Sequence, residues 1–287
     1  MDVKDILPDF IGVVRGFQAS EATDANAPRI RAEIDRAGVL VFKDQRQLDD
    51  DALLAFARRF GALHRSITAK RSDLERRFAN DELSDISNLE RDGSILPRDD
   101  MRRIQQRANL VWHTDNSFRT PAGEYTMLAA RIVPEQGGET EFADCRAAYE
   151  ALPDTMKQRI ADLQVEHSLA RTRQLVGTGG VFDAEEEGRF PSRTQPLVKC
   201  NPRTGRQALY IGAHAARIVG WGEAESRALL DELLDFATQV QFVYRHSWSM
   251  GDLAMWDNTA TLHRAISFDD AIFRRDLRRV STALEEA

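Results

Sequence analysis

Short apolar runs, each the length of one buried strand and bounded by turn residues, are the feature that most limits how this chain can fold. Helical segments with apolar residues three or four positions apart lie between these runs. Short strands with inserted helices predict a mainly β fold with helices (α+β), built on a sandwich or jelly-roll core. The expected strands are 39–42, 85–89, 125–130, 140–143, 197–200, 208–211, 240–247, 253–256 and 274–282.

Two long polar segments, 65–107 and 172–195, interrupt these elements. Each is either a lid over a functional site or a solvated surface excursion, and the sequence favours neither interpretation over the other. No internal repeat or low-complexity linker divides the chain, which predicts a single domain over residues 1–287. The expected helices are 28–37, 50–60, 146–163 with an interruption at Pro153, and 223–238.

The charge balance is mildly acidic, because 39 basic and 46 acidic residues give a formal charge of −7. Without a basic excess, neither nucleic acid nor an anionic membrane is an expected partner. The two cysteines, Cys145 and Cys200, fit no metal or disulfide spacing, which favours a reducing compartment. A charged N-terminus and the lack of any apolar stretch near the roughly 18 residues of a membrane span predict a soluble, cytoplasmic protein.

A histidine and a carboxylate two positions apart, His113 and Asp115, follow the apolar run Leu110–Trp112. On a β-strand, side chains alternate between the two faces, so this pair would point the same way. Two histidines and one carboxylate form the ligand set of non-haem iron(II), and the pair supplies two of the three. The pair alone favours a plainer interpretation, a buried histidine beside a solvated aspartate.

A third ligand has to come from elsewhere in the chain. Among the six histidines, His113 alone has a carboxylate two positions further on. His263 follows an expected strand and a short polar loop, where the end of a strand can present a ligand. His214 and His246 lie beside apolar segments, which favours satisfied core histidines. A carboxylate among histidine ligands shifts the expected metal from a redox-silent ion towards iron(II).

Arginines four positions apart mark the last expected strand, 274–282. Arg275 and Arg279 share one of its faces. A buried guanidinium needs an anionic partner, and a bidentate carboxylate is its best match, so this face suits two anions in a row. The alternative, which the strand taken alone favours, is a solvated edge whose charges prevent aggregation.

Taken together, these residues resemble the iron(II)- and 2-oxoglutarate-dependent dioxygenases of the taurine dioxygenase and 2,4-dichlorophenoxyacetate dioxygenase family, with the aryloxyacetate branch nearest. The resemblance covers nearly the whole chain and implies a double-stranded β-helix (jelly-roll) core with helical insertions. It also implies that His113, Asp115 and His263 bind iron(II). The segments that carry it are 57–61, 85–88, 112–115, 137–142, 211–215, 251–258, 262–264 and the arginine-rich end.

The same resemblance implies a site for the co-substrate 2-oxoglutarate. Thr140 and Arg275 would hold its distal carboxylate, with Trp256 lining that pocket. The span from the last iron ligand to the arginine pair is one residue longer than in the close relatives, so Arg274 is an alternative to Arg275. The strand argument prefers Arg275, because Arg279 then lies on the same face.

The resemblance further implies a small anionic substrate, whose charged group pairs with Arg279 while Asn109 and Ser117 lie beside it. Dioxygen would then drive decarboxylation of 2-oxoglutarate to succinate together with hydroxylation of the substrate. Hydroxylation next to an ether oxygen gives a hemiacetal that splits into a phenol and an oxoacid. A homo-oligomer is expected. The alternatives are the same chemistry on a natural-product carboxylate or on a sulfonate or sulfate ester, and a non-catalytic sensor that binds metal and 2-oxoglutarate.

Overall fold

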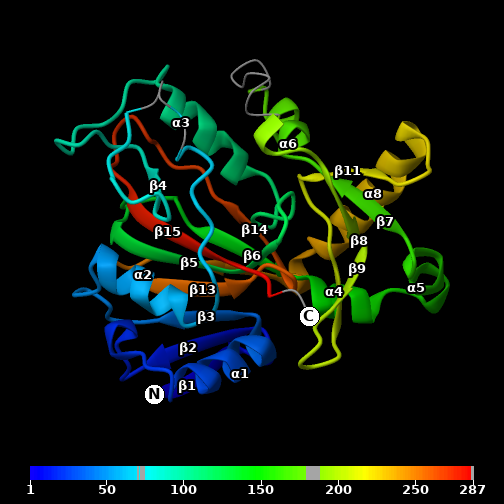
Figure 1. Ribbon diagram of the computed structural model, residues 1–287, viewed down its shortest axis with the longest axis horizontal. Coiled ribbons are helices and arrows are strands. Elements are labelled where there is room, and N and C mark those ends of the chain that lie inside the picture. The colour runs from blue at the N-terminus through cyan, green and yellow to red at the C-terminus, as the bar shows by residue number, and fades with distance from the viewer. Residues whose placement is uncertain (70, 72–74, 179–187, 286–287) are drawn as a thin grey trace.

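The computed structural model describes residues 1–69, 71, 75–178 and 188–285, and helices surround a core of strands (Figure 1). The α-helices are α1 (Ala27–Ala37), α2 (Asp50–Arg58), α3 (Met101–Gln105), α4 (Cys145–Ala151), α5 (Asp154–Ile160), α6 (Leu169–Leu175) and α8 (Glu223–Ala237). The 3₁₀-helices are η1 (Ala19–Glu21), η2 (Gln106–Leu110) and η4 (Val240–Phe242). The strands are β1 (Asp2–Leu7), β2 (Ile11–Arg15), β3 (Val39–Phe42), β4 (Ser84–Ser87), β5 (Gly123–Ile132), β6 (Thr140–Asp144), β7 (Gln164–His167), β8 (Arg193–Pro196), β9 (Val198–Cys200), β10 (Gln207–Leu209), β11 (Ala215–Ile218), β12 (Val243–His246), β13 (Leu253–Asp257), β14 (Thr261–Ala265) and β15 (Asp276–Ala283).

The core consists of two sheets packed against each other. The larger has seven strands in the order β1-β2-β3-β13-β5-β15-β4, and the smaller has three in the order β12-β6-β14. Their facing side chains meet at Phe142 on β6 and Trp256 on β13, whose ring centroids are 5.4 Å apart. Within each sheet, neighbouring strands are antiparallel except β2 and β3. This is the jelly-roll core with helical insertions that the sequence predicts.

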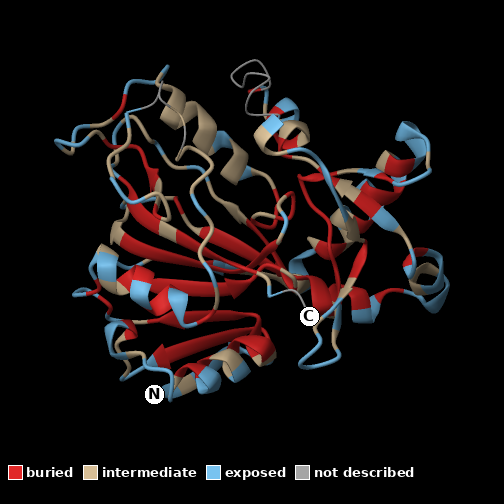
Figure 2. Ribbon diagram, viewed as in Figure 1, coloured by how far each residue is buried: buried red, intermediate tan, exposed pale blue. Residues whose placement is uncertain are grey.

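Strand β3 and residues 253–256 of β13 are buried on both faces of the large sheet, which explains why these segments are apolar at every position. On β3, Val39 and Val41 pack between the two sheets, whereas Leu40 and Phe42 pack against the helices α1 and α2. Strand β13 alternates in the same way. A sheet covered on both sides needs continuous apolar strands, and Figure 2 shows these strands buried while the helices expose their outer faces.

A second packed region lies behind the small sheet. It contains α4, α5, α8, the hairpin β9–β10 and the three-stranded sheet β11-β7-β8. Helix α8 contributes Leu229, Leu230 and Leu233 to its core, as the expected helical spacing predicts. Ala143 of β6 and Leu262 of β14 pack into the same core. The small sheet therefore packs against other elements on both of its faces.

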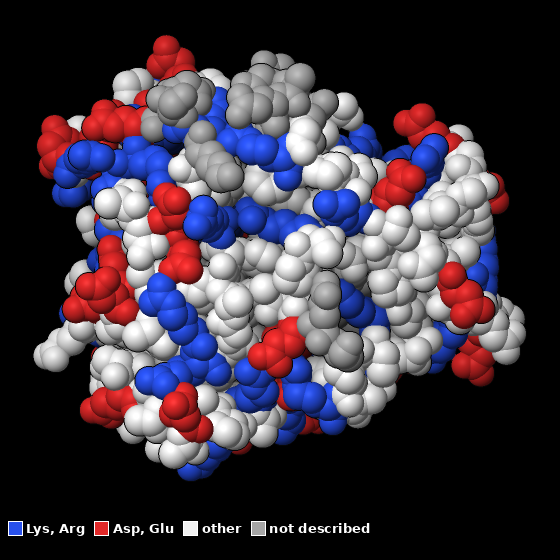
Figure 3. Space-filling view, viewed as in Figure 1, with Lys and Arg blue, Asp and Glu red and all other residues white. Residues whose placement is uncertain are grey.

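The boundaries differ from the sequence predictions in a few places. The strand expected at 274–282 begins at Asp276, and the first part of 240–247 is the 3₁₀-helix η4. Among its described residues, segment 65–107 contains only β4, α3 and part of η2 as named elements. Residues 70, 72–74 and, in segment 172–195, 179–187 lie outside the described part. Basic and acidic side chains are interspersed over the face in Figure 3. None of the helices in the described residues is long and apolar enough to cross a membrane.

Candidate metal centre

Two distant segments of the chain meet through a backbone bridge between two histidines. The amide nitrogens of His113 and His263 each donate to the carbonyl of the other, at 3.0 and 2.9 Å. This antiparallel pairing places the two rings side by side, with centroids 4.1 Å apart. His263 lies within β14, directly opposite Phe142 on β6, so its ring faces the space between the two sheets. The imidazoles are therefore fixed by the sheet itself.

Asp115 completes the cluster. His113, Asp115 and His263 each offer one potential ligand atom, and these three atoms all lie within 4.8 Å of one another. The Nε2 atoms of His113 and His263 lie 3.8 and 3.6 Å from the Asp115 carboxylate oxygens. All three side chains are buried. Within the described residues, this is the one group of three or more potential metal ligands that could hold an ion.

Hydrogen bonds fix the orientation of the Asp115 carboxylate. Its Oδ2 accepts from the Thr126 hydroxyl at 2.9 Å, and its Oδ1 accepts from Arg279 at 3.0 Å. Its backbone N–H donates to the Asn258 side-chain oxygen at 3.2 Å, and Asn258 in turn donates to Thr126 at 2.9 Å. Such partners orient metal ligands and tune their basicity. Sequence analysis did not identify Thr126. It gave Asn258 no role of its own, but Asn258 lies in one of the segments that carry the family resemblance.

The local structure of the His-x-Asp pair differs from the prediction, and the expectation of a strand was wrong. Leu110 ends η2 and is 43% exposed, so the apolar run is not a buried strand. His113 makes a single bridge, and Asp115 begins a turn that continues through Asn116, whose φ is 58°. The two side chains converge because Asn258 holds this turn, not because a strand alternates. His263 likewise lies inside a strand rather than after one.

The protonation states suit a metal ion. Burial lowers the pKa of both His113 and His263, which keeps the imidazoles neutral and able to coordinate. Burial alone would raise the pKa of Asp115, but Arg279 and the two histidines outweigh it and hold that pKa well below its usual value. The His113 Nδ1 lies 2.8 Å from the carbonyl of Val111, which leaves Nε2 directed at the cluster. Two neutral imidazoles and one carboxylate fit iron(II).

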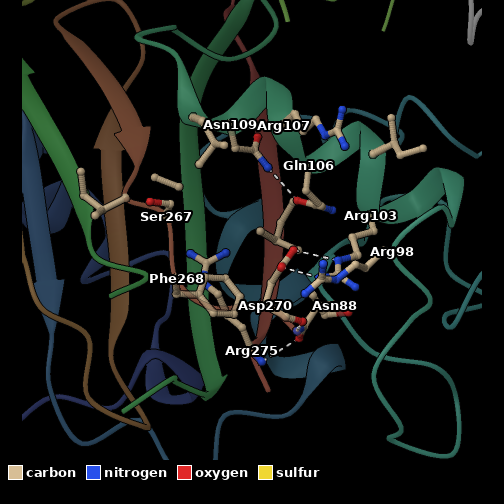
Figure 4. Close-up of a pocket in the computed structure, with 16 residues that line it drawn as sticks. Asn88, Arg98, Arg103, Gln106, Arg107, Asn109, Ser267, Phe268, Asp270 and Arg275 are labelled. Carbon is tan, nitrogen blue, oxygen red and sulfur yellow. Dashed lines mark hydrogen bonds and ion pairs between the residues drawn. The ribbon is translucent and has the colours of Figure 1, made fainter. Parts of the chain in front are cut away.

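A cavity of about 400 Å³ has Arg275 in its wall (Figure 4), together with Ala265, which lies two residues after His263. Arg275 is 7% exposed, and its Nε has no hydrogen-bond partner in the described part of the chain. Burial lowers the pKa of its guanidinium to about 10. Arg274, by contrast, is exposed, so of the two alternatives only Arg275 points inward. A buried, unpaired guanidinium on a cavity wall is a site for an anion.

A second, smaller cavity of about 120 Å³ has Arg279 in its wall. Apolar side chains such as Phe78 and Leu83 share that wall. The two cavities have Ile86, Ser87, Gln106 and Asn109 in common. The Asn109 amide donates to Gln106 Oε1 at 2.7 Å, so this pair stands between the cavities (Figure 4). Sequence analysis identified Asn109 and missed Gln106, whose neighbourhood carries no motif.

The remaining predicted residues lie as follows. Thr140 begins β6, is 3% exposed, and its hydroxyl accepts from the indole of Trp248 at 3.0 Å. Trp256 is buried with its ring 4.6 Å from that of His263. Ser117 is fully buried and hydrogen-bonded to His167 at 2.8 Å, and it lines neither of the two cavities described above. The structure therefore brings Thr140 and Trp256 to the inner side of the small sheet and turns Ser117 towards the second region.

Comparisons with known proteins agree with this geometry. Residues 2–281 match the family model described as "Taurine catabolism dioxygenase TauD, TfdA family". The chain is 42% identical over 276 residues to the alpha-ketoglutarate-dependent 2,4-dichlorophenoxyacetate dioxygenase of Burkholderia sp. (strain RASC), covering 96% of this chain and 92% of that protein. It is 37% identical to the (S)-phenoxypropionate/alpha-ketoglutarate-dioxygenase of Sphingobium herbicidovorans, covering 93% and 90%. The crystal structure of AAD-2 in complex with Mn(II) and N-oxalylglycine matches with a TM-score of 0.88 at 37% identity, covering 99% of both chains.

The chain therefore belongs to the taurine catabolism dioxygenase TauD, TfdA family. The enzyme class expected from the sequence is confirmed: the protein is an oxidoreductase that uses iron(II), 2-oxoglutarate and dioxygen.

Proposed function

We propose that the protein hydroxylates a small anionic substrate of the aryloxyalkanoate class, coupled to conversion of 2-oxoglutarate to succinate, with cleavage of the ether. The observation that carries this proposal is the buried His113, Asp115 and His263 cluster. These three side chains would hold iron(II). When bound, iron(II) and 2-oxoglutarate would activate dioxygen, which oxidises 2-oxoglutarate to succinate and carbon dioxide and turns a C–H bond of the substrate into C–OH. The chain's own residues would bind and orient the substrate and the co-substrate, and they would exclude water.

On the co-substrate side, Arg275 would pair with the distal carboxylate of 2-oxoglutarate and Thr140 would hydrogen-bond it. The unpaired Arg275 guanidinium supports this assignment, because a carboxylate would satisfy it in two parallel hydrogen bonds. Strand β14 connects the two residues, since Ala265 is paired with Thr140 and shares a cavity wall with Arg275. Trp256 would cover this pocket from the large sheet and help to exclude water.

On the substrate side, Arg279 would pair with the anionic group, and Asn109 would lie between substrate and co-substrate. The smaller cavity supports this assignment, because it joins Arg279 to an apolar wall that suits an aryl ring. Two relatives are named for the substrates 2,4-dichlorophenoxyacetate and (S)-phenoxypropionate. Each of these molecules combines a carboxylate with an aromatic ring. Ser117 contributes to the substrate side only indirectly, through the turn that carries Asp115.

An anaerobic titration followed by admission of oxygen tests the proposal. Adding iron(II) and 2-oxoglutarate to the purified protein should produce a weak visible charge-transfer absorption, and His263→Ala should abolish it. Oxygen with phenoxyacetate should then release succinate and phenol in equal amounts. Lack of the absorption band would contradict the cofactor assignment. Succinate release with a sulfate ester or a natural-product carboxylate, but with no aryloxyalkanoate, would contradict the substrate class alone.

We also propose that the protein works as a homo-oligomer in the cytoplasm and binds neither nucleic acid nor membranes. The formal charge of −7 supports the absence of nucleic-acid binding. Sedimentation velocity at micromolar concentration measures the oligomeric state, and a monomer would contradict that part.

A further inference from the structure

The Thr140 hydroxyl has one neighbour that no role assigned so far explains. Trp248 lies two residues after the end of β12, and its Nε1 lies 3.0 Å from Thr140 Oγ1. An indole N–H can only donate, so Thr140 must accept in this hydrogen bond. A hydroxyl that accepts through one lone pair keeps its own hydrogen for another partner. Among the residues that the structure describes, no acceptor for that hydrogen is found.

The position of the Trp248 ring is set by a short buried chain of contacts. The ring packs edge-on against His246, with centroids 4.6 Å apart and planes at 81°. His246 is 4% exposed, and its Nε2 lies 3.2 Å from the carboxylate of Asp252. Asp252 in turn accepts from Lys43 at 2.7 Å and from the backbone N–H of Ser249 at 3.0 Å. The turn between β12 and β13 therefore fixes the direction of the indole N–H.

Strand pairing and the backbone before β6 place Thr140 near Arg275. Thr140 is paired on one side with His246 of β12 and on the other with Ala265 of β14. Ala265 and Arg275 share the wall of the larger cavity. Two residues before Thr140, a Cβ added to Gly138 would come within 3.7 Å of Arg275 Nε, so the backbone leading into β6 passes close to this guanidinium.

We infer that Trp248 is a positioning residue: by occupying a lone pair of the Thr140 hydroxyl, it turns the Thr140 O–H towards the carboxylate that Arg275 binds. This inference rests on the proposed function, because it assumes that 2-oxoglutarate binds between Thr140 and Arg275. Without the indole, the hydroxyl is free to rotate and to act as an acceptor, which opposes a carboxylate. Trp248 touches neither iron nor co-substrate in this account and acts only through Thr140.

A double-mutant cycle on binding, without turnover, tests the inference. The four proteins are wild type, Trp248→Phe, Thr140→Val and the double variant, each loaded with Mn(II) and titrated calorimetrically with N-oxalylglycine. Trp248→Phe should weaken binding about fivefold, the size expected for one hydrogen bond. Thr140→Val should weaken it at least as much, and the double variant should be no weaker than Thr140→Val. Thr140→Ser keeps the hydroxyl and should bind within about twofold of wild type.

Two controls separate this role from a general structural one. Trp221→Phe removes an indole from the second packed region and should leave the affinity unchanged. In Zn(II)-loaded protein with ¹⁵N-labelled tryptophan, Thr140→Val should shift one indole N–H resonance, and N-oxalylglycine should move the same resonance only in wild type. This spectrum serves as the test if Trp248→Phe does not fold.

The inference would be overturned if the losses in affinity of Trp248→Phe and Thr140→Val multiplied in the double variant. It would also be overturned if Trp248→Phe bound N-oxalylglycine as tightly as wild type. Wild type that does not bind N-oxalylglycine at all would instead contradict the proposed function.

Discussion

Arg275 and Arg279, two arginines near the start of the last strand, differ in what surrounds them. Arg275 is buried, lies directly before β15 and has no ion-pair partner in the described residues. Arg279 lies within β15, has a side chain 20% exposed and already pairs with Asp115. Arg275 is therefore a buried cation without an anionic partner in the described residues, whereas Arg279 is already paired with the Asp115 carboxylate. Under the proposed function, the co-substrate would bind an unpaired guanidinium, whereas the substrate would compete with Asp115 for Arg279.

The residues proposed to act beside the two arginines come from different parts of the fold. Thr140, Trp248 and Trp256 lie on or next to strands of the two packed sheets. The smaller cavity around Arg279 is lined largely by residues 66–68 and 75–109, a segment with little regular structure. Loops between elements vary more readily than strands that are buried on both faces. Residues between 86 and 110 also line the larger cavity around Arg275, so the contrast holds for Thr140, Trp248 and Trp256 and not for the cavity wall as a whole.

The largest expected effect comes from removing the ligand that both sides share. Asp115→Ala should weaken Mn(II) binding by at least about 100-fold and abolish turnover, because the carboxylate supplies one of three ligands. Calorimetric titration with Mn(II) measures the affinity. Asn258→Ala, which removes only a hydrogen-bond partner of Asp115, should have a smaller effect of about 10-fold. Equal losses in both variants would contradict the assignment of Asp115 as a ligand.

Arg275→Met should act on the co-substrate side alone. Losing a buried, charge-assisted pair costs about 2–5 kcal/mol, so N-oxalylglycine binding should weaken roughly 30- to 5000-fold. The ligand-free variant should melt at a higher temperature than wild type, because an unpaired buried charge has been replaced by an apolar side chain. Arg274→Met is the matched control, since Arg274 is exposed, and it should change neither quantity. An equal loss in the control would reverse the choice between the two arginines.

Arg279→Ala should act on the other side. The KM for phenoxyacetate should rise about 10- to 100-fold, while the affinity for N-oxalylglycine stays within about twofold. Because Arg279 also pairs with Asp115, the Mn(II) affinity has to be measured in the same variant. Arg279→Lys keeps the charge and should recover part of the loss, though not all, since a lysine cannot form the bidentate pair. An equal factor of loss in the KM for phenoxyacetate and in the affinity for N-oxalylglycine would contradict the assignment of Arg279 to the substrate.

The sequence was most informative where one physical rule decides the outcome. Buried strands such as 39–42 and 253–256 were correctly expected because a run that is apolar throughout has few alternatives. The preference for Arg275 over Arg274 followed from the alternation of side chains along a strand, which places Arg275 and Arg279 on one face, and Arg275 is the buried one of the two. The single domain over residues 1–287 stays a prediction.

The sequence was least informative where a long-range contact decides the local structure. The strand expected before His113 does not form, because one bridge to His263 and the hydrogen bonds of Asn258 replace strand pairing there. Ser117 was expected near the substrate, yet its hydroxyl bonds to His167 on β7, a contact between residues far apart in the chain. Neither contact has a signal in the neighbouring residues. Periodicity describes which face a side chain lies on, and it does not describe which distant segment meets that face.

The smallest expected effect lies at the boundary between the two sides. Gln106 accepts from Asn109 at 2.7 Å and donates to the backbone of Asp85 at 3.1 Å, so it fixes the amide that both cavities share. Gln106→Ala should weaken N-oxalylglycine binding and raise the KM for phenoxyacetate by a similar factor, about fivefold. The reason is that the Asn109 side chain loses its one neutral hydrogen bond to Gln106. Gln105→Ala is the control, since Gln105 lines only the smaller cavity. A change on one side alone would show that Asn109 serves only that ligand, and the two arginines would then work in separate compartments.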